Sequence, residues 1–247
     1  MSALLIAAGL VYLLIGDLGE AILLLMFANF SPLIAVVQEP GLAGTLVVDF
    51  STIGPAAARE FSEALARRGL AFVDAPVTGG DVGAKAGTLT IMVGGDATDF
   101  DKASPVFAAV GKFAKHCGPS GAGQAVKLCN NVLGALHMVA LAEAFARRQG
   151  VDPSLVVEVC STGATGSWAL SDLGPRVLQR DFAPGFMVKH LVKDLRLALE
   201  SPADAELGDA ELGDLHGTML AKKLLEHVAD KGGADLGTQS MTMAYEK

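Results

Sequence analysis

A strand–helix–strand alternation in the first half of the chain constrains the fold more than any other feature. Residues Leu46–Phe50 form a short β-rich run, and a helix is predicted over Ala56–Arg68, with Pro55 in its first turn and Gly69 at its end. Residues Leu70–Asp74 then return to the strand pattern. Because two strands joined by a helical crossover pair in parallel, the alternation predicts a parallel sheet with helices on its faces.

The pattern continues and then changes character after the sheet. A glycine-rich loop is expected over Asp74–Thr88, a strand over Leu89–Val93 and a helix over Thr98–Val110. From Gln124 to Gln149 the chain is apolar and lacks proline, which predicts one long helix buried on nearly all sides. Shorter helices are expected after it, over Pro153–Cys160, Trp168–Gln179, Val188–Glu200 and Met219–Val228. The chain therefore combines an α/β front with an all-helical back.

The beginning of the chain is strongly apolar, with runs at Ala3–Ile15 and Ala21–Phe27. Neither run reaches the roughly 20 residues that a helix needs to cross a bilayer. No positive charge precedes Arg59, although a secretory signal usually begins with one. Two buried segments of a globular core are therefore favoured over one broken membrane span, and no membrane partner is expected.

Composition and charge narrow the function classes. Hydrophobic residues make up 51% of the chain and charged residues 19%, a balance typical of a globular protein. The net charge of -8 provides no basic field, so no nucleic-acid partner is expected. The 3 cysteines form no CxxC pair and the 5 histidines fall at no ligand-like spacing, which favours a reducing compartment such as the cytoplasm and no metal site. Cys129, within the long apolar helix, is expected to be a small core residue.

A glycine-rich segment after the second strand is the first candidate binding element. Gly79 and Gly80 have no Cβ, so their backbone N–H groups can approach an anion closely, and Thr78 adds a hydroxyl donor beside them. Several donors in a small volume suit a carboxylate. The local chemistry alone is equally consistent with a tight turn after a strand.

A lysine within the long helix is the candidate catalytic group. Lys127 and Asn131 are four residues apart and therefore share one helix face. A lysine in an apolar helix must reach the surface, pair, or face a cavity, and burial favours its neutral form, which can act as a base. Asn131 can donate a hydrogen bond to a substrate oxygen or orient the lysine. The simpler alternative is a lysine that reaches the surface at a domain boundary.

The segment Lys193-Asp194-Leu195 is the third candidate. By itself it has the pattern of an ordinary amphipathic helix with a surface charge pair.

Taken together and in this order, these segments resemble the 3-hydroxyisobutyrate dehydrogenase family, the β-hydroxyacid dehydrogenases. The matching pieces are Val48–Pro55, Asp74–Gly95, Gly118–Asn131 and Lys193–Leu195, within a similarity that runs from about residue 44 to 199. The resemblance implies a Rossmann-type α/β domain over residues 1–118 and an all-α domain over residues 119–247, linked by the helix at 124–149. It also implies a homodimer or homotetramer, because the apolar helical half resembles the family's dimerisation domains.

The resemblance further implies an activity and residue roles. The chain is expected to be an NAD(P)-dependent oxidoreductase that interconverts a small 3-hydroxy acid and its semialdehyde or keto form. Its partner is thus a small carboxylate-bearing substrate, and its cofactor is NAD or NADP. Related imine reductases usually lack the lysine, so its presence favours carbonyl and alcohol chemistry. The resemblance assigns Thr78, Gly79 and Gly80 to the site of the substrate carboxylate. It makes Lys127 the general acid/base, with Asn131 as its partner. It also implies that Thr52 and Lys193 contact the cofactor near the nicotinamide.

One family feature is missing from the sequence. Family members open with a strand and a GxGxxG loop that cradles the dinucleotide pyrophosphate at a helix N-terminus. No GxGxxG occurs in this chain, so the Rossmann-type domain is expected to be incomplete at its N-terminus. Two alternatives follow: a non-catalytic family member that acts as a binding or oligomerisation module, or an incomplete gene model.

Overall fold

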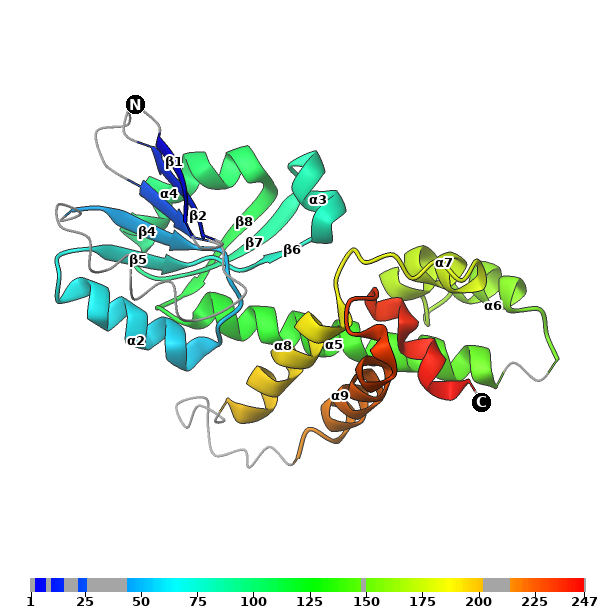
Figure 1. Ribbon diagram of the computed structural model, residues 1–247. Coiled ribbons are helices and arrows are strands. Elements are labelled where there is room, and N and C mark those ends of the chain that lie inside the picture. Colours follow the sequence, from blue (N-terminus) through cyan, green and yellow to red (C-terminus); the bar gives the residue numbers. More distant parts are fainter. Residues whose placement is uncertain are drawn as a thin grey trace. The chain divides into compact units, whose positions relative to one another are not determined.

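The computed structural model describes residues 3–7, 10–15, 22–25, 44–147, 150–201 and 214–246, and only the backbone of those before residue 44. The chain divides into two compact units, Met1–Leu128 and Cys129–Lys247. The division falls inside the long helix α5 (Ala122–Ala146) (Figure 1). The first unit is α/β and the described elements of the second are helical, as the predicted fold class requires.

The described strands form one mixed, eight-stranded sheet in the order β1-β2-β3-β4-β5-β7-β6, with β8 paired to β7. Strands β3, β4 and β5 are parallel, whereas β1–β2, β2–β3 and β5–β7 pair antiparallel. The parallel pairing predicted for the strand–helix–strand unit is confirmed in β4 and β5, and β7 and β8 also pair in parallel, whereas the antiparallel pairs make the sheet mixed. The bounds are β1 (Ala3–Ala7), β2 (Leu10–Ile15), β3 (Ile22–Leu25), β4 (Leu46–Asp49), β5 (Ala71–Asp74), β6 (Val77–Thr78), β7 (Leu89–Gly94) and β8 (Gly111–Gly118).

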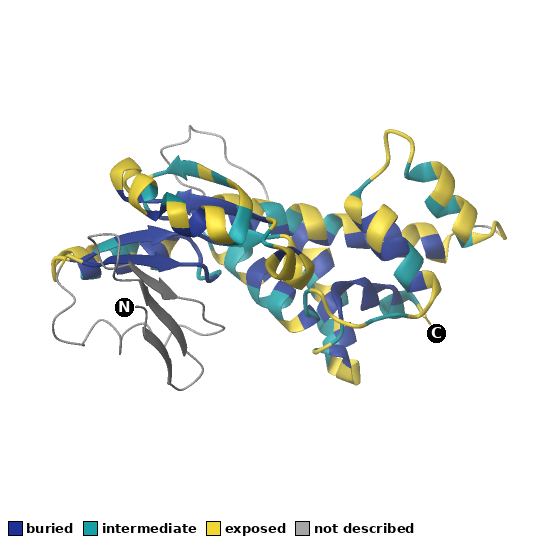
Figure 2. Cartoon of the chain, turned by 90° about the horizontal axis from the view of Figure 1, so that it is seen from above, coloured by how far each residue is buried: buried dark blue, intermediate teal, exposed yellow. Residues whose placement is uncertain are grey.

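Helices cover both faces of the central strands, which explains why β4 and β5 are apolar at successive positions. Helix α2 (Pro55–Ala66) packs on β5, and helix α4 (Ala97–Val110) packs on β4, β5, β7 and β8. Val48 and Val73 belong to a buried cluster with Phe107 of α4. Phe72, which alternates to the other face, lies against Phe61 of α2, with ring centroids 6.5 Å apart. Figure 2 shows these central strands as a buried layer.

The second unit is built from the later part of α5 and the helices that follow it. Its core contains buried side chains of α5 and α8 together with Leu225 and Met241. The helices are α6 (Pro153–Cys160), α7 (Gly174–Leu178), α8 (Val188–Glu200) and α9 (His216–Val228), with η1 (Ala169–Leu173), η3 (Ala229–Gly233) and η4 (Thr238–Tyr245) as π and 3-10 segments. The predicted bounds of α6 and α8 are confirmed, whereas the helix expected from Trp168 is divided into η1 and α7.

The long helix differs from its prediction in burial. It begins at Ala122, two residues earlier than expected, and much of one side faces solvent. Val126 is 42% exposed and Leu133 is 59% exposed, and Cys129 is exposed rather than in the core. By length and composition α5 could cross a membrane, a test that core helices also pass. Its buried hydrogen bonds from Gln124 and Asn131 match the pattern of a core helix.

Helix α3 (Gly80–Ala86) and strand β8 are among the elements that were not expected from the sequence. Helix α3 occupies part of the predicted loop. Its buried position is a glycine, Gly83, rather than a large apolar residue, so the sequence shows no apolar helical face. Strand β8 carries exposed Lys112, Phe113 and Lys115, so it lacks the apolar run by which strands are identified.

Candidate active site

The predicted carboxylate site lies where β6 ends and α3 begins. Thr78 is the last residue of β6, and Gly79 is the N-cap of α3. Gly79 and Gly80 have φ values of 130° and 62°, which other residues rarely adopt. Both glycines are exposed, Thr78 is half-buried, and no side chain caps this helix start. The segment therefore presents backbone donors and a hydroxyl toward solvent, an arrangement that suits a carboxylate.

Lys127 belongs to a polar stripe on the buried side of α5. Gln124, Lys127 and Asn131 follow one another at helical spacings of three and four, and are 0%, 7% and 5% exposed. The apolar Val126, next to the lysine, is 42% exposed. This inverts the usual placement of charged and apolar residues. A buried amine is costly unless it is satisfied or used, so this inversion marks a functional candidate.

Asn131 is held by a carboxylate that is itself almost fully buried. The Asn131 side-chain Nδ2 donates to Asp194 Oδ2 at 2.6 Å, and the exposed fraction of Asp194 is 2%. Lys193 Nζ lies 2.9 Å from Asp194 Oδ1. Asp194 thus joins two of the predicted site residues, Asn131 and Lys193, in one cluster within the second unit. Because Nδ2 is engaged by the carboxylate, the amide oxygen of Asn131 has a fixed direction.

A second buried carboxylate, that of Asp74, binds the backbone at the start of α5. Asp74, at the end of β5, accepts hydrogen bonds from Gly121 N at 2.7 Å and from Gln124 N at 2.9 Å. Burial raises the pKa of Asp74 above its ordinary value, and the backbone donors oppose that shift. A Cβ on Gly94 would lie 2.5 Å from Asp74 Oδ1, and one on Gly123 would lie 2.8 Å from Oδ2. These two positions therefore need glycine so that the carboxylate can reach the helix.

The loop that carries Thr52 is bound by the side chain of Gln124. Gln124 Oε1 accepts from Ile53 N at 3.0 Å and from Gly54 N at 3.1 Å, and its Nε2 donates to Ser51 O at 2.8 Å. The loop follows β4, one of the three parallel strands. Dinucleotides bind outside the carboxyl ends of such strands, so Thr52 lies at the edge of the sheet where a cofactor contact is expected.

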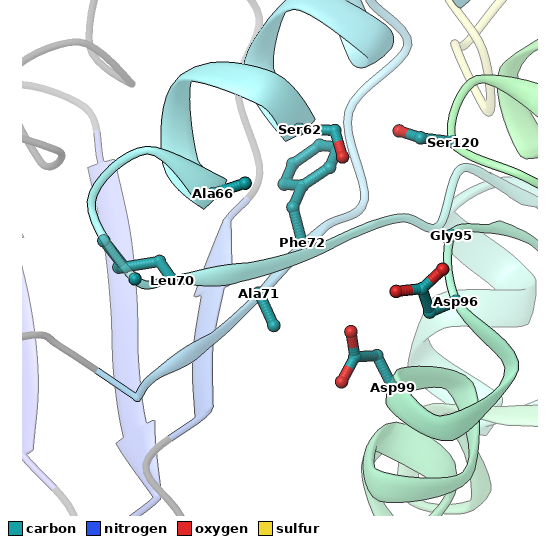
Figure 3. A pocket seen from close by; sticks show the side chains of 10 residues that line it. Ser62, Ala66, Leu70, Ala71, Phe72, Gly95, Asp96, Asp99 and Ser120 are labelled. Carbon is teal, nitrogen blue, oxygen red and sulfur yellow. The ribbon is translucent and has the colours of Figure 1, made fainter.

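The described residues do not supply the pyrophosphate loop. The glycine-rich start of α5 is the nearest match in composition, but Asp74 already accepts hydrogen bonds from its first amides. A hollow of about 390 Å³ lies elsewhere in the first unit, and none of the predicted site residues lines it (Figure 3). Its lining includes the carboxylates of Asp96 and Asp99, which disfavour a phosphate. Among the described residues, the fit of this chain to a dinucleotide therefore rests on the loop of Thr52.

Sequence reasoning gave no role to Gln124, Asp74 or Asp194, although Asp74 and Asp194 belong to segments that it singled out. Gln124 also had a usable signal, because it is polar and lies one turn before Lys127 in an apolar helix. Its loop partners lie about 70 positions away in sequence and are not visible in it. Among the described residues, no group of three or more histidine, cysteine or acidic side chains could hold a metal ion.

Comparisons with known proteins give two family matches that together cover most of the chain. Residues 14–129 match the NAD binding domain of 6-phosphogluconate dehydrogenase. Residues 121–245 match the NAD-binding model of NADP-dependent 3-hydroxyisobutyrate dehydrogenase. The matched region thus extends beyond both ends of the similarity expected from the sequence motifs.

Individual relatives give the same result. An oxidoreductase of Synechocystis is 53% identical over 85% of this chain and 71% of its own length. An NAD-dependent L-serine dehydrogenase of Pseudomonas aeruginosa is 44% identical over 70% of this chain and 60% of its own length. Among solved structures, a 3-hydroxyisobutyrate dehydrogenase of Mycobacterium tuberculosis with L-serine superposes with a TM-score of 0.71. It shares 32% identity and is matched over 83% of this chain and 71% of its own.

Proposed function

The chain belongs to the 3-hydroxyisobutyrate dehydrogenase family, and from this membership we propose that it interconverts a small 3-hydroxy acid and its semialdehyde or keto form. The coarser assignment, NAD(P)-dependent oxidoreduction of a hydroxy acid, follows from the family, and the cofactor is NAD or NADP. The observation that carries the proposal is the buried polar stripe of α5, with Lys127 between Gln124 and Asn131.

Each predicted residue has a task in this reaction. The donors at Thr78, Gly79 and Gly80 bind the substrate carboxylate and so fix the position of the hydroxyl-bearing carbon. Thr52 and Lys193 contact the cofactor. When bound, the nicotinamide takes a hydride from that carbon during oxidation and returns it during reduction.

Lys127 moves the proton that balances the hydride. In oxidation, its neutral amine accepts the proton of the substrate hydroxyl, while the C–H electron pair leaves with the hydride and the C=O bond forms. In reduction, the protonated amine returns that proton to the new alkoxide oxygen. Asn131 is the partner of Lys127 in this proposal: one Nδ2 hydrogen is donated to Asp194 and the amide oxygen accepts from Asn130, which leaves the second Nδ2 hydrogen as the donor for a substrate oxygen.

The experiment that tests this function has two stages. NADH and NADPH are first titrated into the chain by calorimetry, and binding of one of them at micromolar to millimolar concentration is expected. Turnover is then measured with L-serine, 3-hydroxyisobutyrate and other short hydroxy acids and semialdehydes. If neither dinucleotide binds at millimolar concentration, the enzyme assignment fails for this chain.

A second candidate function is a non-catalytic binding or oligomerisation module. It is favoured by the missing GxGxxG loop. It is also favoured by exposed apolar side chains of the second unit, which include Leu133, Val159 and Trp168. These side chains also support the proposal of a homodimer or homotetramer, which sedimentation analysis tests. Oligomers without dinucleotide binding would favour the second candidate over the first.

A further inference from the structure

We propose that Gln124 is a positioning residue that sets the nicotinamide-contacting loop against the helix that carries Lys127. The inference rests on the proposed function, because it assumes that Thr52 contacts the cofactor and that Lys127 moves the proton. It concerns a residue to which neither the sequence motifs nor the comparisons give a role.

The contacts of Gln124 enclose Thr52 on both sides. Its side-chain amide bonds the residue before Thr52, through Ser51 O, and the two residues after it, through the N–H groups of Ile53 and Gly54. All three bonds lie between 2.8 and 3.1 Å. Gln124 is 0% exposed, so water has no access to replace a bond that is lost. The loop therefore has one position relative to α5 for as long as this amide is present.

The backbone of Gln124 ties a second predicted ligand segment to the same point. Gln124 N donates to Asp74 Oδ2 at 2.9 Å, and Asp74 lies four residues before Thr78. One residue thus contacts the loop of Thr52 through its side chain and the strand that leads to the carboxylate site through its main chain. Lys127 follows Gln124 by three residues, a rise of about 4.5 Å along the helix.

This arrangement gives Gln124 a consequence beyond stability. Hydride transfer requires the donor and acceptor carbons at near-contact distance, and small displacements of either reduce the rate steeply. A loop that moves away from α5 would displace the nicotinamide while leaving the remainder of the dinucleotide in place. Loss of the Gln124 bonds is therefore expected to weaken interactions of the nicotinamide end selectively.

Two variants and a matched control separate positioning from folding. Gln124→Met keeps a similar shape and removes all three bonds. Gln124→Glu keeps an acceptor for Ile53 N and Gly54 N and replaces the donor to Ser51 O with a second acceptor oxygen. The control is Gln239→Met, because Gln239 is also buried, at 1% exposed, and its Nε2 bonds two distant backbone oxygens, those of Asp181 and Ala183. No site residue is among its partners.

The first readout is binding of NADH and of ADP-ribose, which lacks the nicotinamide. For Gln124→Met, the Kd for NADH should rise about tenfold, the equivalent of about one net hydrogen bond, while the Kd for ADP-ribose stays within about twofold. Gln124→Glu should lie between this variant and the wild type. Gln239→Met should lower the melting temperature without changing the ratio of the two Kd values.

The second readout is the deuterium isotope effect on kcat, with a substrate labelled at the hydroxyl-bearing carbon. It should rise in Gln124→Met, because hydride transfer becomes slower than the other steps, and stay at the wild-type value in Gln239→Met. Equal weakening of NADH and ADP-ribose, or an unchanged isotope effect in a folded Gln124→Met, overturns the positioning role. If Gln124→Met does not fold, the same criteria apply to Gln124→Glu. Absence of NADH and NADPH binding in the wild type rejects the proposed function itself, and the inference with it.

Discussion

Two buried carboxylates, one in each unit, bind the helix α5 in different ways. Asp74 is 0% exposed and accepts hydrogen bonds from backbone N–H groups of Gly121 and Gln124. Asp194 is 2% exposed and contacts the side chains of Asn131 and Lys193. The two sites have similar burial, and they differ in whether the partners are main chain or side chain.

The difference indicates separate roles for the two acids. Backbone donors at a helix start are fixed once the chain path is fixed, so Asp74 determines where α5 begins relative to β5. Side-chain partners have rotamers to choose from, so Asp194 determines how Asn131 and Lys193 are oriented. Removal of Asp74 should therefore act mainly on stability, and removal of Asp194 mainly on turnover.

The largest effect is expected at Lys127, on the helix segment between the residues that the two acids bind. Lys127→Ala should reduce kcat by about 1,000-fold, because general acid/base groups contribute roughly 100- to 10,000-fold. The variant should keep its fold, so the loss of turnover is not a loss of folded protein. Steady-state kinetics in both directions and a thermal melt provide the measurement. Turnover within threefold of wild type would show that the helix carries no proton-transfer group at this position.

The next effect is expected at Asp74 and should appear in stability. Asp74→Asn keeps one acceptor oxygen and places an NH₂ group against the second backbone N–H, so one buried donor loses its partner. The free energy of unfolding should fall by about 2 kcal/mol, measured by urea denaturation. Among folded molecules, kcat should remain within about threefold of the wild type. A stable variant with much reduced kcat would reverse the roles that the comparison assigns.

A smaller effect, on turnover, is expected at Asp194. Asp194→Asn keeps an acceptor for Asn131 Nδ2 but removes the charge that faces Lys193, so both side chains lose part of their orientation. A fall in kcat of about tenfold is expected, with a change in melting temperature smaller than that of Asp74→Asn. The control is the ion pair of Lys189, which is on α8 like Lys193, with the exposed Asp235, which follows η3. Asp235→Asn also removes one acid from a lysine and should leave kcat unchanged.

Short-range sequence patterns, which alternate between strand and helix along the chain, predicted much of the fold. Strands β4, β5 and β7 are short apolar runs bounded by turn residues, and helices α2, α4, α6 and α8 lie between clear start and stop signals. Their bounds were found within about two residues. Strand β8 has no such apolar run, because Lys112 and Lys115 are exposed at its edge. The burial of α5 was overestimated, since an apolar composition does not say which side of a helix meets a partner.

The candidate site was predicted as far as motifs with local spacing allow. Lys127 and Asn131 are one turn apart on α5, which the sequence alone indicates, and both are buried. The bonds of Gln124 to Ser51 and Gly54 depend on contacts across 70 or more positions, which no local pattern contains. The assigned roles of these residues stay predictions until the variants are measured.

The smallest effect is expected in the pH dependence of the unfolding free energy. It tests whether burial or the backbone donors dominate the pKa of Asp74. Burial raises the pKa of this carboxyl, whereas the N–H groups of Gly121 and Gln124 act to lower it. A raised pKa means that the folded chain binds a proton at Asp74 more readily than the unfolded chain, so its contribution to stability grows as the pH falls toward the raised value. Exposed acids behave oppositely, since Lys85 and Arg176 lower the pKa values of Asp81 and Asp181.

Asp74→Asn removes the pH-dependent contribution of Asp74 to stability and leaves those of the exposed acids in place. The difference in unfolding free energy between wild type and variant should therefore widen as the pH is lowered from about 7 to about 5. Urea denaturation at several pH values measures it, and Asp81→Asn, at an exposed pair, should give the opposite trend. A gap that narrows would mean that the backbone donors outweigh burial, so that Asp74 is a charged cap on α5 whose pKa is lowered.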